Sequence, residues 1–167
     1  MADERPDEPE DLETPPAFFP YGAEPVIEGE AFVGSTVPVL CRVEAVFAAE
    51  TNQSIHRYVL LSDGDRKLPI MIGQYEAAAI TLPLEGHTPD RPMTHDLIKN
   101  ILDKLEVKIE KVVIDDLWGS TYYAKVHMTV NGEDVVIDSR PSDAIALAVR
   151  ADAPVFVADG ILEQNGN

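Results

Sequence analysis

Two stretches of the sequence match each other when the chain is shifted by 67 residues. The segment LPIMIGQYEAAAI (Leu68 to Ile80) aligns with VVIDSRPSDAIAL (Val135 to Leu147), which places Glu76 opposite Asp143. Each stretch is typical of a β-strand followed by a helix, and each comes after two further strand-like runs. A matching order of elements predicts an internal duplication. If the halves are related by pseudo-symmetry, we expect their strand-to-helix junctions to face one shared cleft.

The first half is expected to contain three strands and two helices. Alternating apolar residues predict the strands in three runs: 37–45, 57–62 and 68–72. A helix is expected from Tyr75, and Pro83 should end or kink it, because proline removes a backbone donor and clashes with the preceding turn. Thr94 is the predicted N-cap of the next helix, which has Asp96 in its first turn. Its apolar residues form one stripe: Leu97, Ile98, Ile101, Leu102 and Leu105.

The second half is expected to repeat this order. Strand-like alternation recurs in three runs: 107–114, 122–130 and 135–138. A bulge is expected near Glu110 and Lys111, where the alternation changes phase. Asn131-Gly132 is a strong type I′ hairpin signal, because both central residues of that turn have positive φ. Pro141 is expected in the first turn of the following helix. The order of strands and helices predicts an α+β domain.

The charge of the chain is concentrated at its N-terminal end. The net charge is −17, and residues 1–30 hold ten acidic residues, six prolines and a single arginine. Such a segment cannot bury enough apolar surface to offset the entropy of ordering. We therefore predict a disordered acidic tail over 1–34, a folded domain over 35–162 and a short C-terminal tail over 163–167. The rest is still acidic, with twenty acids against twelve basic residues over 31–167, which argues against a broad basic face for nucleic acid.

Cysteine content and hydropathy indicate a cytoplasmic protein. Cys41 is the only cysteine, so neither an intrachain disulfide nor a cysteine-based zinc site can form. No run of 18 or more apolar residues is present, and the acidic N-terminal sequence is unlike a secretory signal. We expect no membrane association.

Three segments in this order resemble the bifunctional nuclease domain family. They are LPIMIGQYEAAAI, GHTPDRPMTHDLI (Gly86 to Ile98) and DSRPSDAIALAVRADAPVFV (Asp138 to Val157). The resemblance implies a duplicated three-strand, two-helix unit that closes into a single barrel-like mixed sheet with helices packed on it. It also implies nuclease activity on DNA and RNA, and assembly as a homo-oligomer.

Hydrolysis of a phosphodiester bond needs an activated water and a cationic group, and a divalent metal held by carboxylates supplies both. The predicted catalytic side chains are His95, Asp138, Asp143 and Glu76. The predicted ligands of Mg²⁺ or Mn²⁺ are the three carboxylates among them: Asp138, Asp143 and Glu76. Arginines bind phosphate oxygens in a bidentate manner, and the predicted phosphate ligands are Arg91, Arg140 and Arg150.

Each candidate has a structural alternative. Glu76, Asp96 and Asp143 are all first-turn helix acids, which stabilise the helix dipole without any further role. Asp138 and Arg140 could form a structural ion pair. Two functional alternatives to a nuclease also stay open: a noncatalytic module that binds nucleic acid or nucleotides, and a regulatory oligomeric domain.

Overall fold

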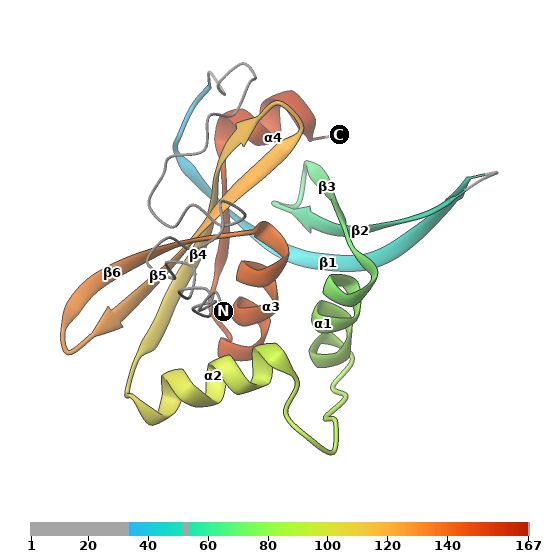
Figure 1. Ribbon diagram of the computed structural model, residues 1–167. Helices are drawn as coiled ribbons and strands as arrows, with labels where there is room; N and C mark the ends of the chain where they lie inside the picture. The colour runs from blue at the N-terminus through green and yellow to red at the C-terminus, as the bar shows by residue number, and fades with distance from the viewer. Residues whose placement is uncertain (1–33, 52–53, 167) are drawn as a thin grey trace, which may run out of the picture.

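A seven-stranded mixed sheet forms the framework of the protein in the computed structural model, which describes residues 34–51 and 54–166 (Figure 1). The strands lie in the order β3-β2-β1-β7-β4-β5-β6. Their bounds are β1 Pro38–Thr51, β2 Ser54–Ser62, β3 Lys67–Ile72, β4 Lys108–Trp118, β5 Thr121–Val130, β6 Glu133–Ser139 and β7 Val155–Ala158. The helices are α1 Gln74–Leu84, α2 Thr94–Lys104, α3 Pro141–Ala151 and α4 Asp159–Asn165. The predicted disordered tail lies outside the described residues, apart from Gly34.

The internal duplication is confirmed for the three-stranded meanders and the helix that follows each, whereas β7 has no counterpart among the described residues of the first half. β1-β2-β3 and β4-β5-β6 are both antiparallel meanders, and each is followed directly by a helix. An offset of 67 residues carries α1 onto α3 over their whole lengths, from Gln74–Leu84 to Pro141–Ala151. Between the two meanders, β7 pairs antiparallel with β1 and parallel with β4. The two halves therefore join through one short strand that comes late in the chain.

The sheet is open. Within the described residues, β3 pairs with β2 alone and β6 pairs with β5 alone, so these two strands form its edges. The expected closure into a barrel is not confirmed, whereas the α+β class and the mixed sheet are. The two meanders diverge as separate wings, and α1 and α3 lie between them (Figure 1).

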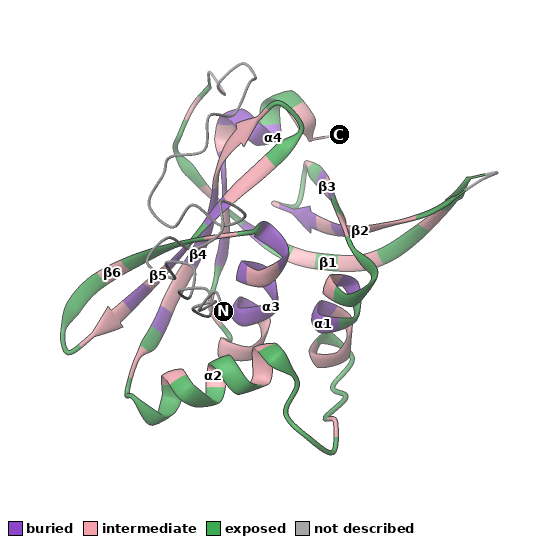
Figure 2. Cartoon of the chain, in the orientation of Figure 1, coloured by how far each residue is buried: buried purple, intermediate pink, exposed green. Residues whose placement is uncertain are grey.

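Helix α3 is the centre of the fold. Residues 141–148 are buried with the exception of Asp143, which is half-buried, and α3 contacts α1, α2, β4 and β5 (Figure 2). Small side chains allow this close packing, because Ala144, Ala146 and Ala148 lie on α3 and Ala77 and Ala79 lie on α1. An apolar helix that is buried almost all round must be a core element. Its first turn is thereby held in a fixed place beside α1.

Most local predictions hold, and two need correction. Residues 163–165 belong to α4, which ends at Asn165, so the predicted C-terminal tail does not begin at 163. Asn131 and Gly132 have φ of 51° and 85°, as a type I′ turn requires. The register of β4 against β5 shifts between Ile109 and Lys111, at the predicted bulge. Thr94 is not the N-cap of α2: Met93 takes that position, and the Met93 N–H donates to Asp96 Oδ2 at 2.9 Å. The first-turn carboxylate satisfies the free amide, so the helix does not need a threonine cap.

Helix α2 keeps most of its apolar stripe in solvent. None of its residues is buried, and only Leu102 packs against the core (Figure 2). Leu97 is 53% exposed, Ile101 48% and Leu105 65%, the last being the C-cap. No helix among the described residues is long and apolar enough to cross a membrane.

Candidate functional site

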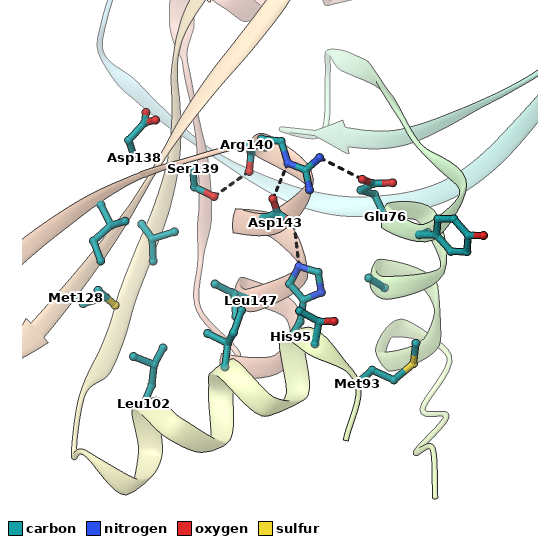
Figure 3. Close-up of a pocket in the computed structure, with 16 residues that line it drawn as sticks. Glu76, Met93, His95, Leu102, Met128, Asp138, Ser139, Arg140, Asp143 and Leu147 are labelled. Atoms are coloured by element: carbon teal, nitrogen blue, oxygen red, sulfur yellow. Dashed lines mark hydrogen bonds and ion pairs between the residues drawn. The ribbon is translucent and has the colours of Figure 1, made fainter. Parts of the chain in front are cut away.

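A cavity of about 760 Å³ lies where helices of both halves meet the β5-β6 hairpin (Figure 3). Most of its wall is apolar, and the apolar side chains include Ile98, Leu102, Val126, Met128, Ile137 and Leu147. Charged side chains gather at the junction end of the cavity, where α1 and α3 begin. A volume of this size suits a small molecule or a single nucleotide unit.

Arg140 connects the two halves at this junction. It is the N-cap of α3, and its Nε donates to Asp143 Oδ2 at 2.7 Å within the same first turn. Its Nη1 donates to Glu76 Oε1, in the first turn of α1, at 3.2 Å (Figure 3). The predicted equivalence of Glu76 and Asp143 is therefore confirmed, and so is the expectation that both junctions face one cleft. Residues far apart in the sequence meet here because α1 and α3 pack side by side.

His95 and Asp143 form a dyad in the same place. His95 is the second residue of α2, and its Nε2 lies 2.9 Å from Asp143 Oδ1 (Figure 3). The His95 side chain is 13% exposed, so most of the imidazole is shielded from water. Because an ionised carboxylate can only accept, Asp143 fixes the ring proton on Nε2 and leaves Nδ1 with its lone pair. An imidazole oriented in this way can take a proton from a bound water.

The environment of Asp143 keeps its carboxyl group ionised. Burial acts to raise the pKa of Asp143, but the hydrogen bonds from Arg140 and His95 and the charge of the guanidinium outweigh it and lower the pKa below its ordinary value. The hydrogen bond to Asp143 likewise raises the pKa of Arg140. The ion pair and the dyad thus stabilise each other through one shared carboxylate.

The predicted metal ligands do not come together. Asp138 is exposed on β6 and points away from Arg140 and Asp143 (Figure 3), while Glu76 and Asp143 already share the guanidinium. Within residues 34–51 and 54–166, no three His, Cys, Asp or Glu side chains are grouped as a metal ion would need. The donor set as arranged does not fit a divalent cation, and metal use stays an untested prediction.

Two of the three predicted phosphate ligands lie outside the cavity. The Arg150 side chain is 8% exposed, and its Nε donates to Asp96 Oδ1 at 2.5 Å. Its Nη1 donates to the carbonyl oxygens of Ala79 and Ala146, so Arg150 ties α1, α2 and α3 together and does not offer its guanidinium to a ligand. Arg91 is exposed in the loop between α1 and α2 and is not among the residues that line the cavity.

The sequence does not indicate that the apolar wall of the cavity belongs to a site. The alternation in β5 places Val126 and Met128 on the inner face of the sheet, which is typical of core residues. Only the three-dimensional arrangement shows that this face, together with Ile98 and Leu102 of α2, borders a cavity. The apolar stripe of α2 was the one signal in the sequence, since the apolar face of an amphipathic helix must border some apolar surface of its neighbours.

Comparison with known families decides the assignment. The Bifunctional nuclease domain model matches residues 59–167, which is more than half of the chain and includes every residue of the junction described above. The chain belongs to the bifunctional nuclease domain family. The match begins within β2, so the first strand of this family member lies outside the matched residues.

Two relatives illustrate the range of similarity within the family. The uncharacterized protein Rv1829 of Mycobacterium tuberculosis is 42% identical over 105 residues, which are 63% of this chain and 62% of the relative. Bifunctional nuclease 1 of Oryza sativa subsp. indica is 28% identical over 116 residues, which are 66% of this chain and 35% of the relative. The chain thus covers less than two thirds of the length of either protein.

Proposed function

We propose that this protein is a nuclease that hydrolyses phosphodiester bonds of DNA, RNA or both at the junction end of the cavity. The observation that carries the proposal is the convergence of Arg140 and the His95-Asp143 dyad. A phosphate ligand and an oriented imidazole are two groups that phosphodiester hydrolysis requires. The name of the rice relative, Bifunctional nuclease 1, supports the same reaction class.

In the proposed reaction, each group has one task. Arg140 binds the non-bridging oxygens of the scissile phosphate and stabilises the negative charge that grows in the transition state. His95 Nδ1 accepts a proton from water as the water oxygen bonds to phosphorus. The bond from phosphorus to the leaving oxygen then breaks, and that oxygen takes a proton from the imidazolium. Asp143 orients the ring and stabilises its protonated form.

Metal assistance is a separate part of this proposal. A divalent ion would activate water and neutralise phosphate charge. Because Asp138, Glu76 and Asp143 are not grouped as ligands, no step is assigned to a metal here. Activity in EDTA compared with Mg²⁺ or Mn²⁺ measures metal dependence directly.

The charge balance predicts weak binding of long nucleic acids. Residues 31–167 carry twenty acids and twelve basic residues, and Arg140 is the only Arg or Lys among the described residues lining the cavity. Few phosphates can then be neutralised, so the affinity for nucleic acid should be low. Its dependence on salt concentration should correspond to only one or two phosphate contacts. Short substrates should compete well with long ones.

A second candidate, a noncatalytic oligomeric or regulatory domain, is favoured by one observation. Four residues of the stripe at α2 are 37–65% exposed: Leu97, Ile98, Ile101 and Leu105. A contiguous apolar stripe on a surface helix is typical of a protein-protein contact. In this alternative, the cavity binds a ligand and transmits its presence to a partner subunit without hydrolysis.

The deciding experiment is an assay of purified protein on short labelled RNA and DNA, single- and double-stranded, with Mg²⁺, Mn²⁺ or EDTA. The proposal expects cleavage that His95→Ala reduces by about a hundredfold or more. His127→Ala is the matched control, because His127 lies on β5 outside the cavity lining. Turnover equal in wild type and His95→Ala would reject this site, and absence of turnover under every condition would favour the noncatalytic candidate.

A further inference from the structure

The junction contains one strong cation and two carboxylates. We name Glu76, His95, Arg140 and Asp143 the junction cluster; with His95 neutral, its formal charge is −1. An incoming phosphate therefore meets a site whose guanidinium is already paired twice. Either a carboxylate must move away from Arg140, or the phosphate must bind against net negative charge.

The two carboxylates hold Arg140 unequally. Asp143 accepts from Nε at 2.7 Å, three residues along the same helix, and also fixes His95. Glu76 accepts from Nη1 at the longer distance of 3.2 Å and across the two halves. The Arg140 side chain is 66% exposed, so water screens both pairs, and the longer distance makes the contact to Glu76 the weaker one. Glu76 is thus the contact that a phosphate can replace.

Gly73 makes the position of Glu76 possible. The 67-residue offset places Gly73 opposite Arg140, and both are N-caps in extended backbone conformation. A Cβ at Gly73 would lie 2.2 Å from Glu76 Oε2, so the absence of a side chain there leaves room for the carboxylate. The duplicated junctions differ accordingly: one has an arginine cap and an aspartate, and the other has a glycine cap and a longer glutamate that reaches across.

We propose that Glu76 is a built-in competitor for the phosphate at Arg140. In the free protein, its carboxylate takes the Nη1 position that a bidentate phosphate uses. Substrate phosphate displaces Glu76 and binds the guanidinium. The ion pair between Glu76 and Arg140, which joins the two halves at the junction, is then broken. This inference rests on the proposed function, which makes Arg140 the phosphate ligand. It assigns Glu76 a role in setting substrate affinity, separate from proton transfer.

The test measures phosphate affinity without turnover. Inorganic phosphate is titrated into wild type, Glu76→Gln and Gly73→Ala, and binding is followed by ³¹P NMR. Glu76→Gln removes the charge and keeps the shape, so phosphate should bind about five- to tenfold more tightly. Gly73→Ala pushes the flexible end of Glu76 away and keeps the charge, so it should tighten binding by a smaller factor.

Glu85→Gln is the matched control for net charge. Glu85 is the C-cap of α1, its side chain is 59% exposed and it does not line the cavity, so phosphate affinity should stay at the wild-type value. Unchanged or weaker phosphate binding in both Glu76→Gln and Gly73→Ala overturns the inference, and so does undetectable binding in all proteins. Tighter binding in Glu76→Gln with no nuclease activity in wild type would keep the inference and reject the proposed function.

Discussion

Arg150 on α3 and Asp96 on α2 form an ion pair with 2.5 Å between Nε and Oδ1, although 54 residues separate them in the sequence. From the sequence alone, Arg150 is a candidate phosphate ligand and Asp96 is a first-turn acid that stabilises the helix dipole. The structure joins them instead, because the last turn of α3 passes the first turn of α2. This pair fixes α2, and with it His95, relative to the rest of the junction cluster.

Replacement of Arg150 by methionine should cost stability. The substitution leaves the Asp96 carboxylate without its guanidinium partner and removes two bonds to backbone oxygens. Loss of one partner of a mostly buried pair destabilises by about 3 kcal/mol. Chemical denaturation measures this free energy of unfolding. Arg42→Met, at an exposed position of β1, is the control and should change it by less than about 0.5 kcal/mol; equal losses in both variants would contradict the role of the pair.

The same pair predicts how stability depends on pH. The hydrogen bond from Arg150 lowers the pKa of Asp96 below its ordinary value, against the opposing effect of burial. A lowered folded-state pKa gives stability that is present above the unfolded-state pKa of about 3.9 and is lost as pH falls through the folded-state value. Melting temperatures measured between pH 2.5 and 7 should therefore decrease once the pH is below about 4. The decrease should be less steep in Asp96→Asn than in wild type. Parallel curves for wild type and Asp96→Asn would show that another titrating group dominates the pH dependence of stability.

Asp143→Asn separates catalysis from helix stabilisation. The amide keeps the shape but loses the charge that orients His95 and pairs with Arg140, so turnover should fall by about a hundredfold. A purely structural first-turn acid would instead cost about 0.3–1 kcal/mol of stability with activity unchanged. Initial rates and melting curves of the same samples distinguish the two. Asp103→Asn, on the exposed part of α2 outside the cavity lining, should leave rates at the wild-type level.

The exposed stripe of α2 predicts a contact between copies of the chain. If it is buried in a homo-oligomer, Ile101→Lys should shift the protein toward monomer in light scattering coupled to gel filtration. The melting temperature at low concentration should change little, because Ile101 is 48% exposed within one chain. Ile55→Lys tests the same substitution at another exposed site, on β2, and should leave the mass unchanged. A monomeric wild type would reject this contact.

A chain that begins at Gly34 tests the predicted tail. It keeps the backbone bonds that α4 makes to the start of the domain, from Gly160 N–H to Ser35 O and from Asp159 N–H to Val37 O. If residues 1–33 add nothing to the fold, the melting temperature should stay within about two degrees of the full chain. A larger drop would mean that an aromatic residue of that segment, such as Phe18, binds to the domain.

The sequence by itself determined the duplicated order of elements, the hairpin at Asn131-Gly132 and the bulge near Glu110. These depend on neighbouring residues, since periodicity, turn chemistry and proline act over a few positions. It also placed Glu76 and Asp143 correctly at equivalent first turns. The family resemblance came from the same local segments.

Tertiary structure alone decided which side chains meet. Arg140 caps the start of α3 and Arg150 lies in its last turn, yet Arg140 lines a cavity and Arg150 is buried against α1 and α2. Asp138 lies five residues from Asp143 but points away from it. The angle and register at which packed elements cross determine which side chains meet. They also determine that the sheet stays open and that the apolar stripe of α2 is exposed. Local periodicity fixes which face of an element is apolar, but it does not fix which distant residue that face will contact.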